Sequence, residues 1–361
     1  MTGIPATMQA MVLTGHGGME AYRWHEDWPV PIPGPGEVLI RVGACGLNNT
    51  DVNTRTGWYA PSVRGATSES AVAEPVGAAP SWGGTPIAFP RIQGADICGR
   101  IVAVGAGVDP ARIGTRVISD VWLRDPADPD NPATAGYVGS ERDGGFAQFC
   151  ALPSGNALEI ASGLTDAELA TFSCSYSTAE GMLTRAGVGP GDTVLVPGAS
   201  GGVGGALVQL ARRRGARVIA MASEAKHAEV AALGPDRIVP RSPDDLRAAL
   251  SGERVSVVAD VVGGAQWEAL ISVLERGGRY VCSGAIAGPM VGLDLRKLYL
   301  GDLTFFGSTV IDRSVMPALV GYIEAGEIRP VLAARYPLAE LCAAQQAFLD
   351  KRHTGNIVVL P

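Results

Sequence analysis

A glycine-rich turn between a strand and a helix constrains the fold of this chain more than any other feature. Residues 194–211 read VLVPGASGGVGGALVQLA, so an apolar strand leads directly into small residues and then into a helical pattern. Glycine-rich letters alone are weak evidence, but this strand–turn–helix context is typical of a unit that binds a dinucleotide. The turn itself consists of Ala199, Ser200, Gly201, Gly202, Val203 and Gly204.

The small residues of the turn have separate expected tasks. Ala199 takes the first small position, Gly201 lets the backbone approach a pyrophosphate, and Gly204 lets the helix pack closely on the strand. The helix start adds unpaired N–H groups and a partial positive charge. The turn therefore predicts that the dinucleotide phosphates bind at its backbone.

Helical and apolar strand patterns alternate from about residue 160 onward. Residues 165–187 read as a helical stretch that opens with a Thr cap, and strands and helices then follow one another as far as residue 285. Alternation at this spacing predicts a parallel sheet that is covered on both faces. We expect an α/β domain with a doubly wound parallel sheet.

The first part of the chain has an all-β pattern. Short β-branched runs at 35–45, 97–105 and 144–152 are broken by glycine and proline. Two long loops, roughly 59–92 and 121–143, lie between these runs. Loops of this length in a compact domain are usually functional or mobile, and the alternative is a surface insertion without a role.

The end of the chain is expected to return to this β-rich part. It carries a helix near 314–325, an amphipathic helix near 338–350 and a last strand, NIVVL. We predict one domain from residues 1–158 together with 315–361, and a second from residues 159–314.

Composition and charge exclude several classes of partner. The formal net charge is −7 and the pI is about 5.2, with Lys and Arg scattered, so we expect no nucleic acid or membrane partner. The first residues lack the pattern of a signal peptide and no stretch reaches about 18 apolar residues, which predicts a cytoplasmic protein. The 6 cysteines form no CxxC pair and are expected to be free thiols.

The end of the strand after the turn indicates which dinucleotide binds. NAD-binding chains usually have Asp or Glu there, whereas this chain has Ala222, then Ser223 and Lys226. A hydroxyl and an ammonium attract a 2'-phosphate that a carboxylate would repel, so we predict NADPH. Two alternatives stay open: Glu224 reaches the ribose from a rotated loop, or Lys226 is a solvated helix residue.

Six segments together carry a family resemblance. They are PGEVLIRV, GLNNTDVNTRTGWY, GADICGRIVAVG, GGFAQF, GASGGVG and HTGNIVVL. They resemble the medium-chain dehydrogenase/reductase superfamily and, within it, the zinc-free quinone oxidoreductase (zeta-crystallin-like) branch, over nearly the whole chain. The resemblance implies a GroES-like β-rich catalytic domain, an inserted Rossmann domain, and a cleft where nicotinamide meets substrate.

The resemblance also shows which metal ligands this chain lacks. Zinc-dependent relatives have a Cys three residues before Asp51, where this chain has Asn48, while Cys45 lies too early. The second ligand position is Ala95, and the third is Cys174, which keeps its sulfur. One ligand of three cannot hold a catalytic zinc, so we expect a metal-free protein.

Without a Lewis acid, the implied reaction is hydride delivery from NADPH to a quinone or an α,β-unsaturated carbonyl. We expect Asn48 to donate an amide N–H to the carbonyl oxygen. Thr50 matches a proton-relaying hydroxyl of zinc-dependent relatives, and Tyr59 is placed to donate a proton or close over the substrate. The plainer interpretation is that Asn48 only fixes its own turn and that Thr50 and Tyr59 only pack.

Other polar residues receive structural interpretations. Asp51 and Arg55 are expected to form an ion pair or to brace a turn. The four histidines, His16, His25, His227 and His353, are expected to be peripheral, since none accompanies a nucleophile.

On the cofactor side, the resemblance implies further binding residues by motif position alone. They are Thr178, Val261, Val262, Gly263, Ser283, Gly284, Ala285, Phe305, Phe306 and Asn356, the last at a position where relatives often carry Lys.

Two rival functions and one assembly state complete the expectations. The rivals are an enoyl-thioester reductase, with Arg55, Arg64 and Arg91 as candidate contacts for its phosphates, and a non-catalytic NADPH-binding sensor. The apolar segment LTFFGSTV, residues 303–310, is expected at a sheet edge. An exposed edge of that kind predicts pairing into a homodimer.

Overall fold

The strand before the glycine-rich turn lies inside a six-stranded sheet with the order β13-β12-β11-β14-β15-β16. The computed structural model describes residues 3–70 and 86–361. All neighbouring pairs in this sheet are parallel, which confirms the predicted sheet type. The strands are β11 (Thr193–Val196), β12 (Arg217–Ala222), β13 (Arg237–Pro240), β14 (Val255–Asp260), β15 (Leu274–Cys282) and β16 (Thr304–Gly307).

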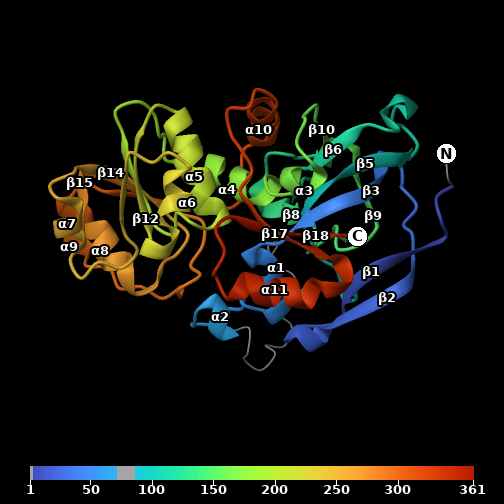
Figure 1. The fold of residues 1–361 in the computed structure, drawn as a ribbon, viewed down its shortest axis with the longest axis horizontal. Coiled ribbons are helices and arrows are strands. Elements are labelled where there is room, and N and C mark those ends of the chain that lie inside the picture. Colours follow the sequence, from blue (N-terminus) through green and yellow to red (C-terminus); the bar gives the residue numbers. More distant parts are fainter. Residues whose placement is uncertain (1–2, 71–85) are drawn as a thin grey trace.

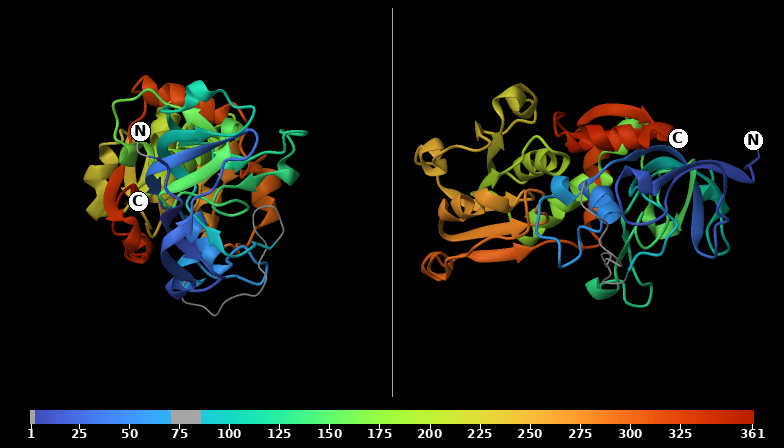
Figure 2. Two further views of the ribbon diagram at one scale, coloured as in Figure 1. Left: turned by 90° about the vertical axis from the view of Figure 1, so that its right-hand side faces the viewer. Right: turned by 90° about the horizontal axis from the view of Figure 1, so that it is seen from below.

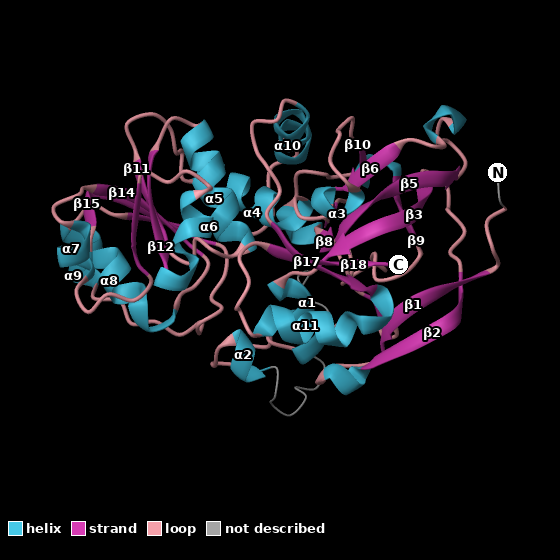
Figure 3. Ribbon diagram, viewed as in Figure 1, coloured by secondary structure: helices cyan, strands magenta, loops and turns pink. Residues whose placement is uncertain are grey.

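Helices cover both faces of this sheet (Figure 3). Because neither face meets water, Val194, Leu195 and Val196 of β11 are all fully buried, and the strand is apolar throughout instead of alternating. The helices are α4 (Ser173–Arg185), α5 (Gly202–Arg213), α6 (His227–Ala231), α7 (Leu246–Leu250), α8 (Trp267–Ser272) and α9 (Leu295–Leu300). The doubly wound α/β arrangement is therefore confirmed.

A second sheet is built from both ends of the chain. Its order is β10-β6-β5-β3-β18-β17, and β9 also pairs with β3. Its strands are β3 (Glu37–Gly46), β5 (Asp96–Val104), β6 (Arg116–Ser119), β9 (Phe149–Pro153), β10 (Ala157–Glu159), β17 (Leu332–Pro337) and β18 (Asn356–Leu360).

The last strand returns to the first sheet, as the sequence predicts. β18 pairs antiparallel with β3, with Val359 opposite Cys45. In Figures 1 and 2 the red C-terminal strands accordingly lie in the same lobe as the blue N-terminal strands. The exact division of the chain at residues 159 and 315 stays a prediction.

Smaller elements complete this lobe. They are β1 (Thr7–Leu13), β2 (Tyr22–Pro29), β4 (Arg91–Ile92), β7 (Trp122–Leu123), β8 (Gly136–Tyr137), α1 (Asn49–Thr56), α2 (Thr67–Ser70), α3 (Asp166–Leu169), α10 (Val315–Glu324) and α11 (Leu341–Leu349). The hairpin of β1 and β2 was not among the sequence expectations. Both long loops contain regular elements: α2 and β4 lie in residues 59–92, and β7 and β8 lie in residues 121–143. Trp82, in the sequence of the first of these loops, lies outside the described residues.

Two predicted elements differ from the structure. The helical stretch 165–187 begins at a Thr165 capping box as expected, but it divides into α3 and α4 because Thr171 and Phe172 form i→i−3 hydrogen bonds that turn the chain. The strand predicted at 144–152 begins only at Phe149. Gly144 and Gly145 instead donate hydrogen bonds to the segment before β5, which draws them out of the ladder.

Arg55 braces three segments and forms no ion pair with Asp51. Its side chain is fully buried, with Nη1 donating to the Gly17 carbonyl at 2.7 Å and Nε to Gln345 Oε1 at 3.2 Å. Asp51 instead closes the capping box of α1, accepting from the Asn48 N–H at 2.7 Å. The ion-pair interpretation is therefore wrong, and the turn-brace interpretation describes both residues.

Within the part of the chain that the structure describes, no helix combines the length and apolar character needed to cross a membrane.

Replacing Gly204 with Ala is expected to destabilise the fold. A Cβ at this position would overlap the Gly198 carbonyl oxygen and lie 2.8 Å from Ala199 Cα, both parts of the backbone. Overpacking of this kind costs about 1–3 kcal/mol. The free energy of unfolding in urea, measured without cofactor, checks this.

Gly205→Ala is the matched control in the same helix. Its Cβ would lie 3.3 Å from Leu233 Cδ1, the flexible end of a side chain, and in ordinary contact with the Ala199 carbonyl oxygen at 3.7 Å. Ala is also the better helix former by roughly 1 kcal/mol. Equal losses of stability in both variants would contradict close packing as the reason for glycine at position 204.

Candidate functional site

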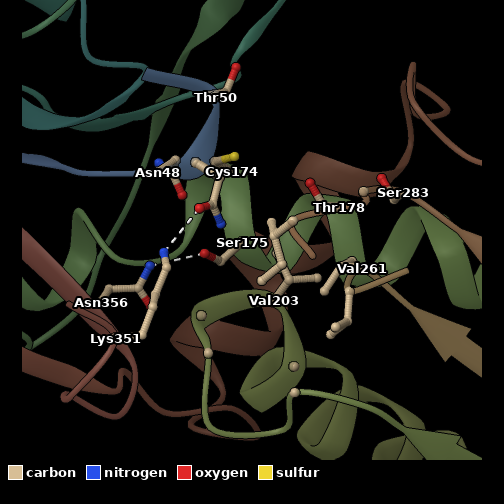
Figure 4. Close-up of a pocket in the computed structure, with 18 of the residues that line it drawn as sticks. Asn48, Thr50, Cys174, Ser175, Thr178, Val203, Val261, Ser283, Lys351 and Asn356 are labelled. Atoms are coloured by element: carbon tan, nitrogen blue, oxygen red, sulfur yellow. Dashed lines mark hydrogen bonds between the residues drawn. The ribbon is translucent and has the colours of Figure 1, made fainter. Parts of the chain in front are cut away.

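A deep pocket lies where the carboxyl ends of the parallel strands face α1 and the C-terminal segment. Most of the residues that the sequence singles out line it: Asn48, Thr50, Tyr59, Thr178, Ser200, Gly201, Gly202, Val203, Gly204, Ser223, Lys226, Val261, Val262, Ser283, Gly284, Ala285 and Asn356. Figure 4 shows the pocket with Asn48 and Asn356 on one side and Val261 and Ser283 on the other. Sequence positions up to 308 apart thus meet around one cavity.

Four of the expected residues lie outside this lining: Ala199, Gly263, Phe305 and Phe306. Ala199 is fully buried beneath the turn, with its N–H donating to the Met221 carbonyl at 3.1 Å, so it supports the turn and does not face the cavity. Phe306 is half-buried on edge strand β16 and packs against the core. The roles of these residues at the cofactor, which motif position alone implies, stay predictions.

The glycine turn forms a cradle that side chains would fill. A Cβ on Gly202 would lie 2.5 Å from Ser175 Oγ and 2.8 Å from Asn356 Nδ2, so the C-terminal segment reaches the turn only because residue 202 is glycine. The Gly355 N–H donates to the Ser200 carbonyl at 2.8 Å. The first N–H groups of α5 remain without intrahelical acceptors, which suits a bound pyrophosphate.

The polar groups beyond β12 differ from expectation in one respect. Ser223 lines the pocket, but the Lys226 ammonium donates to the carbonyls of Lys351 at 2.7 Å and His353 at 2.5 Å. Lys226 is therefore half-buried, and its ammonium is already hydrogen-bonded in this structure. Arg241, at the end of the adjacent strand β13, also lines the pocket, and the parallel β12–β13 pairing brings it to the same sheet edge.

The sequence predicted that His353 is peripheral, and this prediction is wrong. His353 lines the pocket beside these cations. Burial and the charges of Lys351 and Lys226 lower its pKa to about 4. The imidazole is therefore neutral near pH 7. Its proximity to Lys351 comes from the sharp loop before β18, which the sequence pattern did not reveal.

Two buried carboxylates hold Asn48 in place. The Asn48 N–H donates to Asp51 Oδ2 at 2.7 Å, and its amide Nδ2 donates to Asp96 Oδ2 at 3.1 Å. Burial raises the pKa of both Asp51 and Asp96 to about 7. An ionised Asp96 only accepts hydrogen bonds, so it turns the nitrogen of the Asn48 amide toward itself and leaves one N–H to donate elsewhere.

Aromatic and hydroxyl groups surround the cavity next to Asn48. The Tyr59 hydroxyl donates to Thr50 Oγ1 at 3.4 Å, and burial raises the pKa of Tyr59 to about 12, so this phenol stays protonated. Trp122 and Tyr137 come from the second long loop and lie edge to face with ring centroids 5.1 Å apart. The sequence missed this aromatic wall because a two-stranded ladder inside a long loop gives no periodic signal.

Comparison with known proteins identifies the family. The model of the alcohol dehydrogenase GroES-like domain matches residues 34–162, and that of the zinc-binding dehydrogenase matches residues 202–325. A crystal structure of a candidate alcohol dehydrogenase from Sinorhizobium meliloti 1021 is 47% identical, with a TM-score of 0.91 over 99% of this chain and 98% of that chain. The chain belongs to the medium-chain dehydrogenase/reductase superfamily.

Characterised members of this superfamily are similar over the same length. Acryloyl-coenzyme A reductase of Metallosphaera sedula is 27% identical over 98% of this chain and 99% of its own. Human quinone oxidoreductase is 25% identical over 98% of each chain. The chain is thus a medium-chain oxidoreductase that resembles the quinone oxidoreductases, and the cradle at the glycine turn fits the nicotinamide dinucleotide that the superfamily uses.

The residues at the superfamily's zinc position do not fit a catalytic zinc. The Asn48 amide is bonded to Asp96, and Ala95 offers no ligating atom. Burial and the Asp96 charge raise the pKa of the Cys174 thiol well above its usual range, which keeps it neutral. Among the described residues, no group of three His, Cys, Asp or Glu side chains is placed to hold a metal ion.

Asp96→Asn is expected to flatten the pH dependence of stability. The native state holds the Asp96 proton up to a pKa of about 7, whereas the unfolded chain releases it near 3.8, so the wild type loses stability as pH rises between these values. Between pH 5 and pH 7 this loss amounts to about 2–3 kcal/mol. Urea unfolding at several pH values measures this loss of stability. If the free energy of unfolding changed with pH equally in both proteins, the raised pKa of Asp96 would be contradicted.

Proposed function

We propose that the protein is an NADPH-dependent reductase of quinones or α,β-unsaturated carbonyl compounds that works without a catalytic metal. The observation that carries this proposal is the Asn48 amide, oriented by Asp96 at the position of the first zinc ligand. A bound reduced nicotinamide supplies a hydride. The protein must then stabilise negative charge on the acceptor oxygen, and an oriented amide N–H does this.

The proton that completes the reduction has a candidate donor pair. Tyr59 and Thr50 are hydrogen-bonded to each other and both line the pocket beside Asn48. Because the Tyr59 phenol stays protonated across the neutral range, it is able to donate to a developing enolate or quinol oxygen. Trp58 and Trp122 close the apolar sides of the same space, which suits a flat, unsaturated substrate.

NADPH is favoured by the charges at the end of β12 and β13. Ser223 and Arg241 line the pocket there, and Ala222 stands where a carboxylate would select NADH. The cation most available to a 2'-phosphate is Arg241, since the Lys226 ammonium already serves two carbonyls. Position 356 is Asn where relatives often carry Lys, so the preference for NADPH over NADH is weaker than it would be with a second cation.

An enoyl-thioester reductase is the second candidate, because acryloyl-coenzyme A reductase is similar over the whole chain. Of the arginines that could meet its phosphates, Arg55 is fully buried against a carbonyl and Arg91 pairs with Asp143 at 2.8 Å. Of the three, only Arg64 is exposed, and it does not line the pocket. The structure thus offers less to a coenzyme A tail than to a small acceptor.

The proposal is tested by cofactor oxidation with a panel of acceptors on EDTA-treated enzyme. NADPH and NADH are each combined with 1,2-naphthoquinone, but-3-en-2-one and crotonyl-coenzyme A. We expect NADPH oxidation with the quinone or the enone and no effect of EDTA. Equal use of NADH would contradict the NADPH preference, and loss of activity after EDTA treatment would contradict catalysis without a metal. Turnover with crotonyl-coenzyme A alone would favour the enoyl-thioester reductase.

Asn48→Ala is expected to lower kcat by about 100-fold, as loss of an oxyanion donor does elsewhere. Its NADPH affinity should change little, because the amide faces the substrate side. Asn131→Ala, which removes an exposed cap remote from the pocket, is the control. An unchanged kcat in Asn48→Ala would mean that Asn48 only fixes the conformation of its own turn.

We also propose a homodimer that continues the parallel sheet through β16, its last strand. Large apolar side chains crowd the segment before this strand, with Met290, Leu295, Tyr299 and Leu300 each more than half exposed. An apolar group of this kind beside an open sheet edge is typical of a subunit interface. A second copy of the chain is the partner that covers both at once.

Leu295→Glu combined with Leu300→Glu is expected to convert the dimer into a monomer, because two charges would be buried at the interface. Ile113→Glu, at a similarly exposed apolar residue of the other lobe, should leave the mass unchanged. Light scattering after size exclusion measures the mass. A wild-type monomer would refute the dimer outright.

A further inference from the structure

Lys351 is a cation in the cofactor pocket that neither the sequence motifs nor the proposed reaction explains. It lies in the loop between α11 and β18 and lines the pocket with the glycine turn. Its ammonium donates to Asn49 Oδ1 at 3.0 Å and sits 3.6 Å from the centre of the Phe348 ring. Figure 4 shows Lys351 and Asn356 on the same side of the pocket.

The backbone around Lys351 is fixed toward the glycine turn. Lys351 has a φ of 53°, a left-handed conformation that a lysine adopts rarely and that persists only where neighbours enforce it. The Lys226 ammonium binds the carbonyls of residues 351 and 353, and the Gly355 N–H binds the Ser200 carbonyl. The loop that carries Lys351 is therefore tied directly to the turn.

The charge of Lys351 has no counterion in the structure. Among the described residues, no carboxylate forms an ion pair with its ammonium, and Asn49 offers only an amide oxygen. Burial and the charge of Lys226 lower its pKa from 10.5 to about 7. A desolvated ammonium without a counterion is costly, and an anion placed beside it recovers that cost.

Position 356 supplies no cation to this wall of the pocket. Asn356 is neutral, and its Nδ2 donates to Ser175 Oγ at 2.9 Å while the side chain packs against Gly202. Lys351 lies in the same pocket wall and carries the charge that Asn356 lacks. The unpaired N–H groups at the start of α5 face the same space and add to the attraction for an anion.

We infer that Lys351 binds the pyrophosphate of the nicotinamide dinucleotide and takes up a proton as it does so. This inference rests on the proposed cofactor but not on the acceptor. Above pH 7 the free protein holds Lys351 largely neutral, and the bound phosphate restores its proton. Affinity for the dinucleotide therefore falls as pH rises above 7, toward ten-fold per pH unit at most.

Other titrating groups near Lys351 set the conditions of the test. They are Lys226, His353, Arg241, Asp51, Asp96 and Glu229, the last of which accepts a hydrogen bond from Thr354. Asp51 and Asp96 are the chief confounders, because their pKa values also lie near 7. NADPH itself titrates at its 2'-phosphate near pH 6, so measurements belong between pH 7 and pH 9.

The experiment measures cofactor binding and proton uptake, both without turnover. Calorimetric titration of the wild type with NADPH at pH 8, in two buffers of different ionisation enthalpy, should show uptake of roughly one proton per dinucleotide. Lys351→Met should bind NADPH about ten-fold or more weakly at pH 7 and lose most of that uptake. Its affinity should then be nearly independent of pH.

Two further measurements separate the outcomes. Lys351→Arg keeps the charge without titrating, so it should restore binding at pH 7 and flatten the pH dependence. NADH shares the pyrophosphate but lacks the 2'-phosphate, so Lys351→Met should weaken NADH and NADPH by the same factor. A loss confined to NADPH, or uptake that persists in Lys351→Met, would overturn the inference. Failure of the wild type to bind either dinucleotide would instead sink the proposed function.

Discussion

The hydrogen bond from the Gly355 N–H to the Ser200 carbonyl joins the C-terminal segment to the glycine turn in the wall of the pocket. It forms only because the turn has no side chains in the way: a Cβ on Gly202 would collide with Ser175 and Asn356. The C-terminal segment therefore seals one wall of the pocket, and the parallel sheet supplies the other. Pocket shape, loop conformation and the position of Lys351 all depend on this contact.

Two buried carboxylates organise the region around Asn48. Asp51 and Asp96 hold Asn48 through its backbone and its amide. Burial of two acids is unfavourable when both are ionised, which is why their pKa values rise toward 7. Orientation of one amide is thus obtained at the expense of stability.

The sequence predicted those features that depend on residues close together in the chain. The strand–turn–helix pattern located the cradle correctly, and hydrophobic periodicity gave the parallel sheet, because both are encoded by near neighbours. Motif position does not say which way a residue faces, so it could not indicate that Ala199 and Phe306 lie outside the pocket lining. Lys351, Arg241 and Tyr137 were missed, since only the folded chain brings them to the pocket, and the bonding of Lys226 to two carbonyls had no local signature.

The placement of β18 between β3 and β17 has a consequence for how the protein is made. Val358 and Val359 are fully buried in the middle of a sheet whose other strands belong mainly to the first half of the chain. Domains generally fold as units during synthesis, from the N-terminus onward. Residues 356–360 are therefore synthesised after every strand of the parallel sheet, and β3 gains β18 as its neighbour only once those strands have been made.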